Sequence, residues 1–286
     1  MTANSAAMGE PHGARAPGAF DRAVIALTSR LPDNWLGLRL AIGLRRLVTM
    51  RLPDDAGLDV ERFGLRMRLH PRRNACEKGL LFTPQFYEAR ERQELAARIA
   101  KAAAAGRPFV FVDIGANVGL FSLFVASCAG NNARILAVEP ERENLRRLRF
   151  NIDANPGLPI RVLALALGER EGSVALEVHP SDRGGTRTRP LPDSAKASGI
   201  VVECKTLAQV LAQENVQRID ALKIDVEGAE DAILLPFFQA APKSLWPRLL
   251  IVEDTHELWR ADLFAELQAR GYSVTARSKL NAMMVR

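Results

Sequence analysis

The sequence predicts an α/β fold built on a doubly wound, mostly parallel sheet of seven strands. From Pro108 onward, short apolar segments alternate with helical segments, the pattern of parallel strands joined by crossover helices. The segments 272–278 and 282–286 are too close in sequence for such a crossover, so we expect an antiparallel hairpin at one sheet edge. Apolar residues make up 48% of the chain, enough to fill a large core.

Ahead of this region we expect a disordered tail over 1–20 and a cap over 21–79, with the α/β domain covering 80–286. The tail is small, polar and rich in Gly and Pro. Residues 21–50 predict two short amphipathic helices, suited to capping the domain or touching a membrane surface. Residues 60–71 alternate around Phe63-Gly64 and predict a β-hairpin.

Within the domain, helix and strand signals follow one another in order. A helix over 83–105 ends at Gly106, and the helix 141–155 begins after Pro140. Two further strands, 173–178 and 200–206, flank a loop. The seven sheet strands are predicted at 109–114, 133–139, 160–167, 221–226, 249–254, 272–278 and 282–286.

The net charge of +6 and the pI of 9.6 could indicate a nucleic-acid partner. However, the arginines are mixed with acids on predicted helices, as in 141–150, which is typical of solvated helix faces. The three cysteines are odd in number and far apart, which favours reduced thiols in a cytoplasmic protein. No apolar run approaches the roughly 18 residues of a membrane-spanning helix.

One long polar loop, 180–199, interrupts the domain and carries four basic side chains. Loops of this length inside a compact domain are usually functional or disordered. We therefore consider it a candidate substrate lid, with a solvated excursion as the alternative.

The turn after the first domain strand indicates the ligand. It runs from Gly115 to Gly119 and lacks the Gly-Lys-Ser/Thr ending of a phosphate-binding loop. A dinucleotide turn needs a second glycine where this chain has Asn117. The preceding Asp113 would repel a phosphate but attract a cationic ligand.

S-adenosylmethionine fits these requirements because it carries a sulfonium and an ammonium group and no phosphate. The next strand ends at Glu139, where an acid can bind both ribose hydroxyls. Two successive strands that each end in an acid favour this cofactor over a nicotinamide dinucleotide. In the alternative reading, Asp113 and Glu139 only cap helices.

The segments DIGANVGLFSL, VEP, ALGEREG and ALKIDVEGAE resemble the FkbM-type methyltransferases over residues 80–286. The resemblance implies a class I, Rossmann-like methyltransferase fold and an S-adenosylmethionine-dependent O-methyltransferase. It also implies roles for individual residues. Asp113, Gly115, Asn117 and Gly119 would line the methionine portion, Glu139 the ribose, and Ala166, Leu167 and Gly168 the adenine edge.

The strand 221–226 leads into three acids, Asp225, Glu227 and Glu230. Like charges repel, so this grouping indicates function rather than stability. Asp225 would face the cofactor, Glu227 could accept a proton from a substrate hydroxyl, and Glu230 suits the first turn of the next helix. His256 is the candidate base by position. Carboxylates with one histidine would also suit Mg²⁺ or Mn²⁺, but the spacing assigns no metal ligands.

The predicted activity is methyl transfer to a hydroxyl of a secondary metabolite, sugar or glycan. A nucleic-acid methyltransferase is a second hypothesis, although the acids after 221–226 would repel a phosphate backbone, and we expect no nucleic-acid partner. A non-catalytic interaction protein is a third, and a nicotinamide oxidoreductase a fourth. Peripheral membrane contact through 21–50 and a homodimer are compatible with the sequence.

Overall fold

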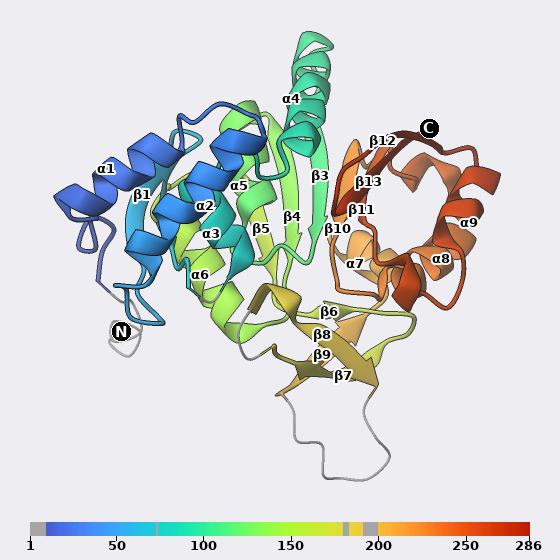
Figure 1. Cartoon of the computed structure of the whole chain (residues 1–286). Coiled ribbons are helices and arrows are strands. Elements are labelled where there is room, and N and C mark those ends of the chain that lie inside the picture. Colours follow the sequence, from blue (N-terminus) through green and yellow to red (C-terminus); the bar gives the residue numbers. More distant parts are fainter. Residues whose placement is uncertain (1–9, 73, 180–182, 191–199) are drawn as a thin grey trace.

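The computed structural model describes residues 10–72, 74–179, 183–190 and 200–286. At its centre lies a seven-stranded sheet in the order β12-β13-β11-β10-β3-β4-β5 (Figure 1). All neighbouring pairs from β11 to β5 are parallel, whereas β13 runs antiparallel to β11 and β12. This confirms the predicted sheet and its edge hairpin. The strands are β3 (Phe109–Ile114), β4 (Ala133–Val138), β5 (Ile160–Leu163), β10 (Ala221–Ile224), β11 (Leu249–Glu253), β12 (Ser273–Arg277) and β13 (Asn281–Val285).

Alternate residues of each central strand point into two different cores. Phe111 and Ile251 belong to one core, whereas their neighbours Val112 and Val252 belong to the other. The first face is covered by α4 (Ala89–Ala104), α5 (Leu120–Ala129), α6 (Arg142–Asp153) and the N-terminal cap. The second face is covered by α7 (Leu207–Gln213), α8 (Glu230–Ala240) and α9 (Leu263–Ala269). Burial on both faces explains why these strands read as continuous apolar runs.

The predicted strand 160–167 is divided between two sheets. Only β5 belongs to the central sheet, and β6 (Ala166–Leu167) pairs instead with β9 (Ile200–Lys205). With β7 (Gly172–Glu177) and β8 (Arg187–Pro190) these strands form a second sheet in the order β6-β9-β7-β8, seen at the bottom of Figure 1. An apolar pattern reports burial, not which sheet a strand joins, so the sequence could not reveal this division.

The cap contains α1 (Ala19–Thr28), α2 (Trp35–Thr49), β1 (Leu58–Arg62), β2 (Leu65–Leu69) and α3 (Ala75–Phe82). The pairing of β1 with β2 confirms the predicted hairpin, and its turn residues Phe63 and Gly64 both have positive φ. Val24 and Met67 share a core with Phe111 of the central sheet. The cap is therefore continuous with the domain, and α3 crosses the predicted boundary at residue 79.

Residues 10–18 differ from the expected disordered tail, because they pack on the hairpin. The Asp59 carboxylate accepts hydrogen bonds from the amides of Gly13 and Arg15, and Arg68 donates to the carbonyls of Glu10 and Pro11. Residues 1–9 of that tail lie outside the described residues.

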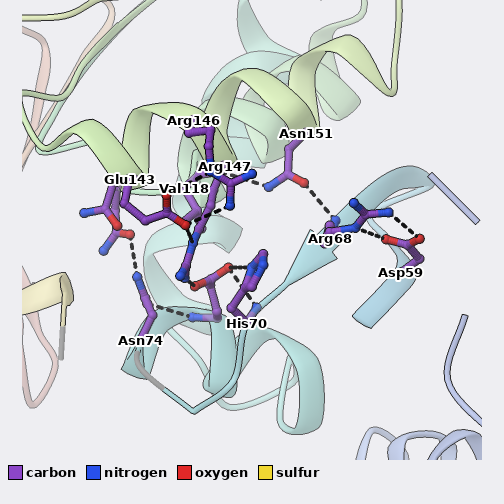
Figure 2. Close-up of polar contacts among 12 residues, drawn as sticks. Asp59, Arg68, His70, Asn74, Val118, Glu143, Arg146, Arg147 and Asn151 are labelled. Carbon is purple, nitrogen blue, oxygen red and sulfur yellow. Dashed lines mark hydrogen bonds and ion pairs between the residues drawn. The ribbon is translucent and has the colours of Figure 1, made fainter. Parts of the chain in front are cut away.

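A buried polar network attaches the cap to α6 (Figure 2). Arg147 Nη1 lies 2.6 Å from Glu77 Oε2, and both side chains are almost fully buried. The amide of Arg68 donates to Asn151 Oδ1 at 2.8 Å. Asn74, the N-cap of α3, donates from Nδ2 to Asn117 Oδ1 at 2.7 Å. The cap therefore reaches the glycine turn and contributes to holding it.

In the described part of the chain, no helix is long and apolar enough to cross a bilayer.

Candidate functional site

A cavity of about 810 Å³ opens at the carboxyl ends of the central strands. Ligands of doubly wound folds bind at this edge, where the strand order reverses. Here the reversal lies between β3 and its neighbours β4 and β10. The cavity lining includes six of the predicted site residues, namely Asp113, Gly115, Asn117, Glu139, Asp225 and Glu227.

The glycine turn is shaped by backbone constraints. Gly115 has a φ of +76°, and a Cβ atom there would lie 1.8 Å from the carbonyl oxygen of Asp225. Only glycine permits so close an approach between the turn and the end of β10. Asn117 also has a positive φ, 54°, and the bond from Asn74 holds its side chain. Gly119 is the N-cap of α5 and packs against Leu148 rather than lining the cavity.

Glu139 lies buried beneath this turn. One carboxyl oxygen accepts the amide of Asn117 at 2.8 Å, and the other accepts the amide of Glu141 at 2.9 Å. A carboxylate offers about four lone-pair positions, and the Asn144 side chain also hydrogen-bonds to it, so about one position remains for a ligand hydroxyl. Burial raises the pKa of Glu139 to about 7, despite the two amides that favour its charged form.

Asp113 is only 1% exposed and caps α5. Its Oδ2 accepts the amide and the hydroxyl of Ser122, at 3.0 and 2.6 Å. Burial raises the pKa of Asp113, and the ammonium of Lys223 opposes that effect. Helix capping and a place in the cavity wall, which the sequence presented as alternatives, coexist in this residue.

Three carboxyl groups gather where β10 and β11 end. The oxygens of Asp225, Glu227 and Glu253 lie within 4.8 Å of one another. Lys223 Nζ lies 2.6 Å from Asp225 Oδ2. Burial alone would lower the pKa of Lys223, but the carboxylates of Asp225, Glu88 and Asp113 outweigh it and raise that pKa. Burial and the neighbouring carboxylates raise the pKa of Glu253 well above its ordinary value.

The loop after β10 is held rigidly by Glu230, which begins α8 as predicted. Its Oε1 accepts the amides of Val226 and Gly228, and its Oε2 accepts the Thr255 hydroxyl and the Trp259 indole N–H. Glu227 between them has a φ of 59° and donates its amide to Glu253. Glu230 therefore has a structural role, whereas Glu227 faces the cavity.

Sequence reasoning missed Glu88 as a site residue. Glu88 has a φ of 46°, lines the cavity, and accepts a hydrogen bond from Asn281 Nδ2 at 2.8 Å. Burial raises its pKa to about 7, although the Lys223 ammonium lowers it. The left-handed backbone of a non-glycine residue indicates a constrained position, but no pattern in the sequence predicts that Glu88 adopts this conformation.

The described part of the long loop lies at the cavity. Residues 184–189 line it, and β8 pairs with β7 in an antiparallel ladder. A Cβ atom on Gly185 would lie 3.9 Å from Glu227 Oε1, so this segment approaches the acidic cluster. Positions 180–182 and 191–199 of the predicted lid lie outside the described residues.

Besides Gly119 and Gly168, three predicted site residues lie away from the cavity wall. His256 is 62% exposed, and its Nδ1 lies 2.7 Å from Asp254 Oδ1. Ala166 and Leu167 are buried in β6 of the second sheet. The lining residues include none of the three.

The chemistry of the lining fits S-adenosylmethionine. The lining contains seven carboxyl groups, among them those of Asp113, Glu88 and Asp225, against three Lys and Arg side chains. Such a wall suits a ligand that carries sulfonium and ammonium charges. Glu139 can accept a ribose hydroxyl with its remaining capacity. The residues of this chain that would hold the cofactor are therefore Gly115, Asn117, Glu139, Glu88 and Asp225.

The chain is similar in sequence to proteins from several organisms. AMB antimetabolite synthetase AmbE of Pseudomonas aeruginosa is 32% identical over 205 residues, covering 59% of this chain and 10% of that protein. Methyltransferase sdnD of Sordaria araneosa is 28% identical over 201 residues, covering 59% of this chain and 74% of that protein. The chain thus spans a tenth of AmbE. Among solved structures, the METTL16 MTase domain has 16% identity and a TM-score of 0.48, covering 94% of this chain and 91% of that one.

The model of the Methyltransferase FkbM domain matches residues 113–274, more than half of the 286 residues. The matched segment begins at Asp113 and contains the glycine turn, Glu139, and the acids that follow β10. The protein belongs to the FkbM family of S-adenosylmethionine-dependent methyltransferases.

Proposed function

We propose that this methyltransferase acts on a hydroxyl group of a small molecule. The observation that carries the proposal is the pair of carboxyl groups, Glu227 and Glu253, beside Asp225 in the cavity wall. A hydroxyl must lose its proton as it is methylated, and a carboxylate within reach can accept it.

Glu227 is the proton acceptor in this proposal. Burial and the neighbouring carboxylates raise the pKa of Glu253, which favours its protonated form and leaves Glu227 as the acceptor. The left-handed backbone of Glu227 and the clamp by Glu230 hold the base in place. When bound, S-adenosylmethionine supplies an electrophilic methyl group on a positive sulfur. Much of the rate enhancement would come from aligning the acceptor oxygen with that methyl group.

A small acceptor is favoured by the size and charge of the cavity. Its volume of about 810 Å³ falls within the range of small-ligand pockets, about 300–1,000 Å³. Its lining has seven carboxyl groups against Lys223, Arg187 and Arg189, and this excess of acids would repel the phosphates of a nucleic acid. The relative AmbE is named as an antimetabolite synthetase, and a small-molecule acceptor is in keeping with that name.

The test combines binding with product analysis. Calorimetry with S-adenosylhomocysteine measures the cofactor site, and mass spectrometry detects methylated products from a panel of alcohols, sugars and amines. Glu227→Gln should bind S-adenosylhomocysteine normally and lose about 10²-fold or more in methyl transfer. Glu257→Gln, an exposed glutamate outside the cavity lining, serves as the control. Full activity of Glu227→Gln, or products methylated only on nitrogen, would contradict the proposal.

A further inference from the structure

Helix α2 carries apolar side chains on a face that the fold leaves uncovered. Four large apolar residues of α2, and Met50 at its C-cap, are between 48 and 79% exposed: Trp35, Leu36, Leu40, Leu47 and Met50. With about 100° between successive helical residues, these five fall within an arc of about 140°, and Leu38, which is 37% exposed, lies about 60° outside it. Gly37, Ala41 and Val48 on the opposite side are buried against the protein. The core therefore uses one side of α2, and the apolar outer side has no partner in the described chain.

Helix α1 extends this surface. Phe20 is 47% and Leu27 51% exposed, and α1 packs beside α2 (blue helices in Figure 1). Of the twelve exposed large apolar side chains in the described residues, eight lie between Phe20 and Met50. Scattered apolar residues on a surface need no explanation, but concentration on one helical hairpin marks an interaction surface.

The same surface is positively charged. Residues 19–51 contain six arginines and two aspartates. Arg39 and Arg46 fall inside the apolar arc of α2 by their helical spacing. The guanidinium of Arg39 lies 5.1 Å from the ring centroid of Trp35, and that of Arg51 lies 4.8 Å from the centroid of Phe20. The arginine side chains therefore lie among the apolar side chains rather than on a separate face.

We propose that the α1–α2 surface binds peripherally to a lipid bilayer that contains anionic headgroups. Trp, Phe and Leu side chains enter the boundary between headgroups and acyl chains, and arginines reach the phosphates around them. With 15 residues, α2 is shorter than the roughly 20 of a spanning helix, so it lies on the surface.

Charge distinguishes a bilayer from a second copy of the chain. In a two-fold dimer the same patch meets itself, which would bring Arg39 and Arg46 of both copies together at an interface. The arginines oppose that arrangement and match an anionic membrane. This surface lies outside the cofactor cavity, so the inference does not depend on the acceptor.

Vesicle flotation tests the proposal. The full chain is mixed with vesicles of phosphatidylcholine alone, or with about 30% phosphatidylserine added to approach an anionic leaflet. We expect binding to the anionic vesicles to exceed binding to the neutral ones about tenfold and to weaken as salt is raised. The triple variant Trp35→Ser, Leu36→Ser, Leu47→Ser should lose binding to both, and Arg39→Gln with Arg46→Gln should lose only the anionic preference.

Val201→Ser, which removes an exposed apolar side chain elsewhere, is the control and should bind as the wild type does. Unchanged S-adenosylhomocysteine affinity and thermal midpoint verify that each variant is folded. Absence of vesicle binding by the folded wild type would overturn the proposal. So would a dimer in light scattering that the triple variant abolishes while vesicle binding persists unchanged.

Discussion

Replacement of Arg147 by alanine tests how the cap is held to the domain. The Arg147 side chain is 3% and Glu77 0% exposed, and their charged atoms are 2.6 Å apart. Removing one partner of a buried ion pair costs about 3–5 kcal/mol, because the other charge stays buried. Glu77 would retain a hydrogen bond from the amide of His70, so we expect the lower end, about 3 kcal/mol.

This free energy converts into a change of thermal midpoint. Unfolding entropy is about 2.1 cal/mol/K per residue, which for 286 residues gives about 0.6 kcal/mol/K. A loss of about 3 kcal/mol therefore lowers Tm by about 5 °C. Differential scanning calorimetry measures this shift directly.

The neighbouring Arg146 provides a matched control. It pairs with Glu143, to which Arg147 also donates, but its side chain is 54% exposed. Exposed pairs contribute at most about 1 kcal/mol, so Arg146→Ala should lower Tm by less than about 2 °C. The double variant Glu77→Gln, Arg147→Met should recover much of the loss, because no buried charge remains at the pair. Equal shifts for Arg146→Ala and Arg147→Ala would refute the reasoning.

Three further outcomes are expected. Gly115→Ala should abolish S-adenosylhomocysteine binding in calorimetry, because its Cβ would meet the backbone at the end of β10, whereas Gly43→Ala, with open space around it, should bind normally. The pKa values of Glu88 and Glu139 are raised from the ordinary 4.5 to about 7. Between pH 4.5 and pH 7 the folded state therefore binds more protons than the unfolded state. The free energy of unfolding of the ligand-free protein should therefore fall as pH rises through that interval in urea titrations, and a Glu139→Gln variant with an unchanged slope would contradict this. His256→Ala should retain most methyl transfer in a product assay, because this exposed side chain is outside the cavity lining; a loss of about 10²-fold would restore it as the base.

Several features of the site could be predicted from local sequence. The apolar runs at Phe109–Ile114 and Leu249–Glu253 are buried on both faces, so each reads as a parallel strand. Gly115 follows such a strand at a position where no other residue fits. Glu139 and Asp225 follow strands of the same sheet, and parallel strands bring their carboxyl ends to one edge. Short-range pattern and sheet geometry together therefore predicted these cavity residues.

Contacts between distant segments could not be predicted in this way. Glu88 reaches the cavity through a left-handed backbone and a bond to Asn281, 193 residues away in sequence. His256 looked suitable because it follows a strand of the sheet, but its exposed position depends on how the loop after β11 folds. Its pairing with Asp254 cannot be read from residue type alone.

The sequence by itself determined the class of fold, the glycine turn and the acids at the strand ends, because these depend on periodicity, φ preference and strand direction. The tertiary structure decided which acids share one cavity, how the cap is joined to α6, and that residues 166–167 leave the central sheet for a second one. Burial and charge coupling arise from segments far apart in the chain. The perturbed pKa values of Glu88, Glu139 and Glu253 therefore exist only in the folded protein.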